Sequence, residues 1–193
     1  MEPDAMKQKG FSLIELLVVI ALLGIVSAFA VPALQNLSQA GKMTQGASAV
    51  LDEIESARQI AEVGSSLIEV RFLKRAGSTH YSGLQLWSTD STPAPLAKAI
   101  PLPDGIVILD DDNLSPWLKE LTLNGSIQSG PWSGGSFVAF RIRPSGPIIP
   151  STLGRNEVFL TVAPDRPYAG SAPPNYCTIQ LNPDSGRTFL FRP

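Results

Sequence analysis

Residues 16–41 contain no charged side chain, and the run as far as Leu34 is almost wholly apolar. A helix of about 20 apolar residues is long enough to cross the hydrocarbon core of a membrane. We therefore expect residues 11–34 to form a membrane-spanning helix. Because Lys7 and Lys9 precede this segment, the positive-inside bias predicts a cytoplasmic N-terminus and places the rest of the chain on the other side of the membrane.

Glu15 interrupts this apolar segment near its start. A carboxylate within a bilayer helix costs roughly 2.5–3.5 kcal/mol, so a lone one indicates a function and requires a partner. Three interpretations are open: a secretory signal cleaved after Ala30 at an Ala-x-Ala site, an uncut signal anchor, or a signal cut between Gly10 and Phe11 that keeps the helix. Only the third supplies a partner, because the cut creates a new α-amino group on Phe11.

The sequence KGFSLIELLVVIALLGIVSAFAVPAL resembles the N-terminal signature of type IV pilins and type II secretion pseudopilins. In that signature Gly10 precedes the cut, Phe11 becomes the first residue, and Glu15 becomes the fifth. The resemblance implies that prepilin peptidase cleaves after Gly10 and that the Phe11 amine is then N-methylated. It also implies that Glu15 pairs with the Phe11 amine of an adjacent subunit during assembly, and that Gly24 and Pro32 soften the helix.

The same resemblance implies a set of partners and a location. The partners are the prepilin peptidase/N-methyltransferase, other pseudopilin subunits, the inner membrane and its assembly platform. The protein is expected to cross the inner membrane once, with a periplasmic C-terminal domain, and to enter a filament after assembly. The leader, residues 1–10, departs from the family by carrying Glu2 and Asp4. Translation from Met6 would give a more typical leader, and both starts remain open.

A second helical pattern continues beyond the apolar run. We expect an amphipathic helix over residues 35–64 that continues the apolar one, because apolar residues recur at helical spacing. Pro32 should bend or soften the continuous helix, since it lacks the N–H that would bond four residues back. Gly64 is expected to end it. This stripe consists of Leu34, Leu37, Ala40, Met43, Ala47, Val50, Leu51, Ile54, Ala57, Ile60 and Ala61. The charged residues that fall largely off it are Lys42, Asp52, Glu53, Glu55, Arg58 and Glu62.

Residues 65–193 read as a β-rich globular domain, which we expect in the periplasm. Fifteen of the seventeen prolines follow residue 90, which excludes long helices there. Strands are predicted where β-branched and aromatic residues gather, at residues 67–73, 81–87, 106–109, 137–143, 157–163, 177–182 and 188–192. The turn sequence NPDSGR predicts a hairpin between the last two, with positive φ at Gly186. The fold class is therefore α+β, with a long N-terminal helix packed on a C-terminal antiparallel β-sheet.

Scattered blocks after the N-terminal segment carry a weaker resemblance. ESARQIAEVGSSLIEVRF, FVAFRIRPSG and NPDSGRTFLFRP are similar to the H-type (FimT-like) minor pseudopilins, and more closely to the pseudopilin-like group called Verru_Chthon cassette protein D. This similarity implies a minor subunit of a type II secretion-like system.

Other candidate sites are weak. The net charge of −2 argues against nucleic-acid binding, and no cofactor, metal or catalytic residue is expected. Residues 110–113, Asp-Asp-Asp-Asn, are predicted to be a solvated turn and not a calcium site. The segment SGPWSGGS is predicted to be a flexible loop. We expect no metal or triad role for His80 and a buried thiol at Cys177. The three tryptophans are expected to pack in the core or on the sheet.

These patterns predict a structural subunit and not an enzyme. The alternative is a secreted or membrane-anchored β-rich binding module whose ordinary signal peptide is cleaved after Ala30.

Overall fold

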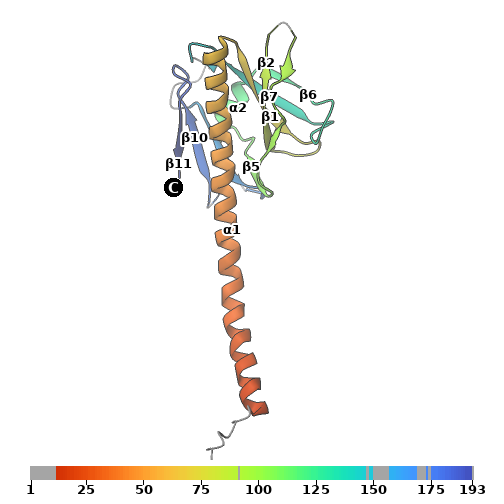
Figure 1. Cartoon of the computed structure of the whole chain (residues 1–193), viewed down its shortest axis with the longest axis vertical. Coiled ribbons are helices and arrows are strands. Elements are labelled where there is room, and N and C mark those ends of the chain that lie inside the picture. Colours follow the sequence, from red (N-terminus) through yellow and green to blue (C-terminus); the bar gives the residue numbers. More distant parts are fainter. Residues whose placement is uncertain are drawn as a thin grey trace, which may run out of the picture. The chain divides into compact units, whose positions relative to one another are not determined.

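The computed structural model describes residues 12–90, 92–146, 148–149, 157–168, 173 and 175–192; for residues 29–37 and 148–149 it describes the backbone alone. The chain forms two compact units, Met1–Gln39 and Ala40–Pro193. Helix α1 (Leu13–Gly64) is 52 residues long and continues through Gly24 and Pro32 (Figure 1). This confirms the predicted long N-terminal helix. A bend at Pro32 stays a prediction.

The end of α1 is a Schellman motif. The Ser66 N–H donates to the carbonyl of Ala61 at 3.2 Å, and Ser65 has a left-handed backbone with φ 48°. This pairing caps a free carbonyl in the last turn of the helix. Gly64 was predicted to stop the helix, and it is indeed the last helical residue, but the left-handed position falls on the serine that follows.

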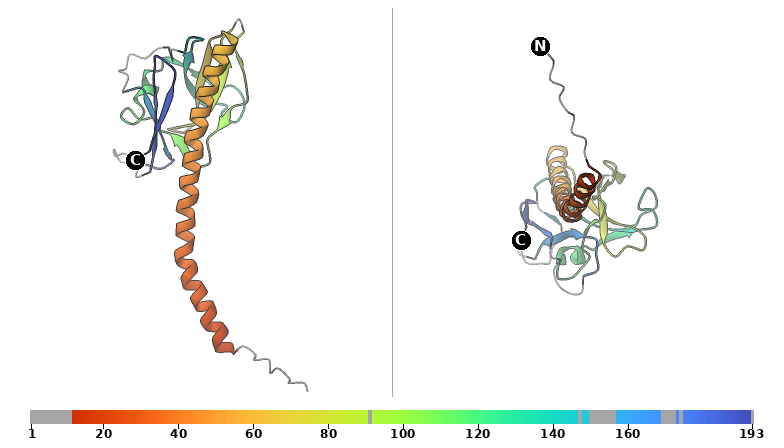
Figure 2. Two further views of the ribbon diagram at one scale, coloured as in Figure 1. Left: turned by 60° about the vertical axis from the view of Figure 1, so that its left-hand side comes forward. Right: turned by 90° about the horizontal axis from the view of Figure 1, so that it is seen from below.

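The second half of α1 lies along one face of the sheet (Figure 2). Six residues of the predicted stripe are buried, namely Met43, Ala47, Val50, Ile54, Ala57 and Ala61. Two assignments were wrong. Ile60 was placed on the stripe but is 38% exposed, and Glu53 was placed off it but is only 7% exposed. Glu53 lies three residues after Val50, so its side chain is directed to the buried side.

The segments predicted as strands all form strands, with bounds within two residues of those expected. They are β1 (Ile68–Lys74), β2 (Tyr81–Ser88), β5 (Ile106–Ile108), β7 (Ser136–Ile142), β9 (Phe159–Pro164), β10 (Cys177–Leu181) and β11 (Thr188–Phe191). The strands without a predicted counterpart are β3 (Ala94–Pro95), β4 (Ile100–Pro101), β6 (Leu123–Ser126) and β8 (Ile148–Ile149). Three of these are only two residues long, too short for an alternating pattern.

Every described strand pairing is antiparallel, in the order β11-β10-β9-β5-β2-β1-β7-β6. β3 and β4 pair with β2, and β8 pairs with β7. In the centre, Val70 of β1 lies opposite Leu86 of β2 and Phe140 of β7. A long N-terminal helix with an antiparallel sheet confirms the α+β class.

A short helix, α2 (Pro116–Glu120), completes the core. Trp117 is fully buried, and its ring centroid lies 4.6 Å from that of Phe140 and 5.9 Å from that of Phe72. The loop before α2 is tied to β9, because the Thr161 N–H donates to the Ser115 hydroxyl at 3.0 Å. Helix α2 has only five residues, which agrees with the prediction that the prolines after residue 90 exclude long helices.

The C-terminal hairpin has the predicted turn. The side-chain oxygen of Asn182 accepts hydrogen bonds from the backbone N–H groups of Asp184 and Ser185, at 2.9 and 3.3 Å. Gly186 has φ 70°, as expected from its sequence position. The turn therefore joins β10 to the edge strand β11.

Replacing Glu53 with glutamine is expected to stabilise the fold at neutral pH. Its Oε1 atom is buried without a hydrogen bond to any described residue, and burial raises the pKa of this carboxyl. The folded chain therefore holds the Glu53 proton more tightly than the unfolded chain, so stability falls as pH rises through the raised pKa. At pH 7 Glu53→Gln should add about 1 kcal/mol to the free energy of unfolding. Denaturant unfolding of the full chain in detergent measures this.

The increase in the free energy of unfolding expected for Glu53→Gln should shrink as pH falls toward 4, where the wild-type carboxyl becomes neutral as well. Glu55→Gln is the matched control two residues along α1. A hydrogen bond from Arg58 lowers the pKa of Glu55, so its removal should cost about 0.3–0.5 kcal/mol at pH 7. A Glu53→Gln gain that is the same at pH 4 and pH 7 would contradict the role assigned to the buried charge.

Candidate processing and assembly site

Helix α1 begins with a capping arrangement that the sequence reading missed. The Ser12 hydroxyl oxygen accepts a hydrogen bond from the Glu15 backbone N–H at 3.2 Å, and the Ser12 carbonyl accepts one from Leu16 at 3.2 Å. Ser12 is therefore the N-cap and Glu15 occupies the third helical position, the spacing of a Ser-x-x-Glu capping box. The spacing of these two residues in SLIE was the signal that could have identified the helix start.

The carboxylate of Glu15 is exposed and makes no hydrogen bond or ion pair with a described residue. It lies in the first turn of α1, where the positive end of the helix dipole favours a negative charge. Among the described residues, the carboxylate therefore remains available to accept a hydrogen bond or to pair with a cation.

The first turns of α1 carry exposed apolar side chains. Between Leu13 and Val26, the large apolar residues are 46–88% exposed. An exposed apolar surface of this kind marks a membrane or subunit contact. Among the residues whose side chains the structure describes, no helix contains a stretch both long enough and apolar enough to cross a membrane.

The other predicted site residues are placed as follows. Gly10 and Phe11 lie outside the described residues. Gly24 is in α1, and beyond its chain neighbours and the nearby helix backbone no described atom lies within 4 Å of where its Cβ would be. Pro32 has a helical backbone, and its side chain lies outside the description. The structure therefore brings together Ser12 and Glu15. The cut after Gly10, the pairing of Glu15 with a Phe11 amine, and the softening of the helix at Gly24 and Pro32 stay predictions.

The acidic run at residues 110–113 forms a turn, but it is not simply solvated. Asp110 is 14% exposed and pairs with Lys74 and with Lys119, the latter at 3.0 Å. These two lysines lower the pKa of Asp110 against the opposing effect of burial. Asp111 instead accepts the backbone N–H of Asn113 at 2.9 Å. Lys119 also lies 3.3 Å from Asp112, so the carboxylates of this run are engaged by lysines and by a backbone N–H group.

His80 takes part in a hydrogen bond to the backbone, and Cys177 is packed in the core. The His80 Nδ1 atom accepts the backbone N–H of Asp110 at 3.2 Å. Cys177 is 1% exposed, as predicted, and burial raises the pKa of its thiol. Within the described part of the chain, no three His, Cys, Asp or Glu side chains are grouped to hold a metal ion.

The tryptophans pack as predicted. Trp117 lies in the core, Trp132 is 3% exposed, and Trp87 is half-buried on β2. Trp132 belongs to the SGPWSGGS segment, which was predicted to be a flexible loop. Its indole N–H donates to the Ser82 hydroxyl at 3.0 Å, so this segment is anchored on β2.

Comparison with known proteins agrees with the predicted processing motif at the N-terminus. Residues 5–31 match the family described as the prokaryotic N-terminal methylation motif. The chain is 32% identical over 152 residues to the type IV major fimbrial protein FimA of Dichelobacter nodosus, an alignment that covers 72% of this chain and 95% of FimA. It is 33% identical over 92 residues to the type IV major pilin protein PilE of Neisseria gonorrhoeae, covering 48% of this chain and 43% of PilE. No solved structure matches significantly.

An N-terminal helix, a C-terminal antiparallel sheet and a processing motif define a pilin-like structural subunit. The chain belongs to the type IV pilin and pseudopilin superfamily. Its motif implies processing by a prepilin peptidase and assembly with other pilin subunits. It also suggests a membrane-anchored N-terminus with an extracellular or periplasmic domain. The curated relatives are structural pilins and not enzymes.

Proposed function

We propose that this chain is a minor pseudopilin of a type II secretion-like system, of the H-type and akin to Verru_Chthon cassette protein D. Prepilin peptidase cuts it between Gly10 and Phe11, and the new Phe11 amine is N-methylated. The similarity of the scattered sequence blocks supports the minor role. The match to the methylation motif over residues 5–31 supports the processing.

Before assembly, residues 11–34 hold the subunit in the inner membrane, and residues 35–64 continue into the periplasmic domain, residues 65–193. The charge-free run supports this arrangement, since its apolar side chains require a membrane or a helix bundle around them. During assembly the subunit leaves the membrane through the assembly platform and packs by α1 against the helices of its neighbours. Gly24 and Pro32 provide the flexibility that this transfer requires.

One observation carries the proposal: a lone carboxylate, Glu15, lies in the first turn of α1, within the stretch from Leu13 to Val26 whose large apolar side chains are exposed. In a low-dielectric bundle this charge needs a counter-charge. The mature amine of a neighbouring Phe11 supplies it, because the cut creates a positive group four residues before Glu15 in every subunit.

Crosslinking in the native cells tests this function. A crosslinkable residue introduced at Leu17 on α1 should give adducts with other subunits that carry the same N-terminal motif. Recovery of the chain as an uncrosslinked periplasmic protein would contradict the proposal and would favour the secreted binding module.

A further inference from the structure

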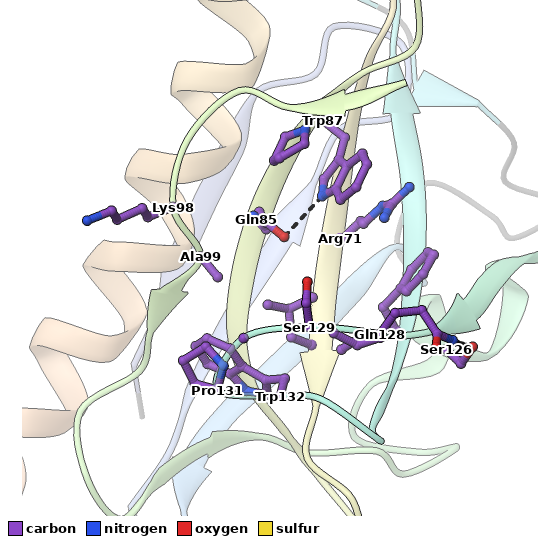
Figure 3. Close-up of a pocket in the computed structure, with 15 residues that line it drawn as sticks. Arg71, Gln85, Trp87, Lys98, Ala99, Ser126, Gln128, Ser129, Pro131 and Trp132 are labelled. Atoms are coloured by element: carbon purple, nitrogen blue, oxygen red, sulfur yellow. Dashed lines mark hydrogen bonds between the residues drawn. The ribbon is translucent and has the colours of Figure 1, made fainter. Parts of the chain in front are cut away.

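A cavity of about 590 Å³ lies on the sheet beneath the β6–β7 hairpin. Its walls come from β1, β2, the β3–β4 segment and the hairpin, and Figure 3 shows Trp87 and Arg71 opposite Pro131 and Trp132. This volume is in the range of small-ligand sites, which are mostly apolar with a few polar groups. All its lining residues belong to the second unit of the chain and are described in the structure.

Arg71 is the charge inside this cavity. Its guanidinium carbon lies 3.7 Å from the ring centroid of Trp87 and 4.1 Å from that of Phe137. Lys98, the second charged lining residue, points away from the other labelled side chains in Figure 3. The lining contains no carboxylate. Contact with two aromatic rings holds the Arg71 guanidinium in place before any ligand arrives.

The charges around Arg71 are not balanced. Glu69 is 4% exposed, and its two oxygens are shared between Arg71, whose Nε lies at 2.7 Å, and Arg141, whose Nη2 lies at 2.9 Å. Two guanidinium groups therefore share one carboxylate. Arg71 bonds Glu69 through Nε alone, and its two terminal nitrogens have no partner among the described residues. They form a free fork that matches a carboxylate.

Three further polar side chains of the cavity already donate hydrogen bonds within the chain. The Trp87 indole N–H donates to Gln85, the Trp132 indole N–H donates to Ser82, and the Gln128 amide donates to Ser126. A saccharide would need several such groups for its hydroxyls, and a phosphate would need more than one free cation. The cavity instead combines apolar walls with one guanidinium group that lies against them, that of Arg71.

From this geometry we propose that the cavity binds a peptide segment of a protein partner, with one carboxylate on Arg71 and apolar side chains against Trp87, Trp132 and Phe137. The inference is independent of the assembly role of α1. The carboxylate is either a chain terminus or an Asp or Glu side chain, since both offer the same two oxygens.

The test uses the full chain in detergent micelles, immobilised and exposed to two pools of random hexapeptides, one with free C-termini and one amidated. Retained peptides are identified by mass spectrometry. We expect retention of peptides that carry both an apolar residue and a carboxylate. Selection from the free-acid pool alone identifies a terminus, and selection of Asp or Glu from both pools identifies a side chain. Arg71→Met should weaken binding about tenfold or more.

Arg75→Met is the matched control, since the Arg75 guanidinium carbon lies 5.7 Å from the ring centroid of Trp132 but Arg75 does not line the cavity. Because Arg71→Met also removes a partner of Glu69, a second variant, Ser129→Trp, fills the cavity and leaves the charges intact. It should abolish retention. The proposal is overturned if no peptide is retained, if retained peptides lack carboxylates, or if Ser129→Trp binds like the parent. Displacement of the peptides by a uronic-acid oligosaccharide would also overturn it, by assigning the site to a sugar.

Discussion

Glu15→Ala is expected to leave the cut after Gly10 unchanged and to lower association with neighbouring subunits more than a hundredfold. The carboxylate is proposed to pair with the Phe11 ammonium of a neighbour inside an apolar helix bundle. Deleting one partner of a buried ion pair commonly costs about 3–5 kcal/mol, and each 1.4 kcal/mol changes an association constant about tenfold. Crosslinking yield through Leu17, measured beside N-terminal processing in the same samples, gives both quantities.

Two further variants separate charge from helix geometry. Glu15→Gln should rescue little, because an amide keeps the shape and loses the charge. Ser12→Ala removes the cap of α1, which is worth about 1 kcal/mol, and keeps the carboxylate. It should therefore assemble far better than Glu15→Ala. If Glu15→Ala were processed and crosslinked like the parent, the pairing role would be wrong.

Gly135→Ala is expected to be the most destabilising small substitution in the sheet domain. A Cβ at Gly135 would lie 2.0 Å from the backbone oxygen of Lys74 and 2.9 Å from that of Trp132. Neither oxygen can rotate away, so β1 and the hairpin would have to separate. We expect a loss of about 3 kcal/mol or more, seen as a fall of about 6–12 °C in the midpoint of thermal unfolding.

The neighbouring Gly134 provides the matched control for this contact. It has φ 77°, and a Cβ there would meet its nearest atom, on Ala76, at 3.8 Å. Gly134→Ala therefore carries only the conformational cost of a left-handed residue, about 1–2 kcal/mol. Equal losses in the two variants would show that backbone conformation, and not the contact with Lys74, decides the effect.

Much of the fold could be predicted because its signals are local. The helix and seven of the strands follow from apolar spacing and β-branched residues, and the last turn follows from Asn182 and Gly186. The sequence could not show the two-residue strands β3, β4 and β8, because their pairing depends on where the chain passes β2 or β7. It also could not show that a helical glycine is required at Gly46, where a Cβ would lie 2.9 Å from a methyl carbon of Ile106.

The two sites differ in how far sequence reveals them. Glu15 stands out because it is the one charge in an apolar run, and Ser12 could have been found from its spacing to Glu15. The cavity around Arg71 could not be found, because its walls come from four separate segments. Glu53, in contrast, could have been placed on the buried side from its spacing of three residues from Val50; its charge made it look like a surface residue.

The central claim is that the chain is cut before its apolar helix and keeps that helix, and the mature N-terminus tests it most directly. Mass spectrometry of the protein extracted from the membranes of its native cells should identify Phe11 as the first residue, carrying one added methyl group on its α-amine. A mature chain that begins at Val31 would contradict the account, because it would have lost Glu15 and the apolar segment together.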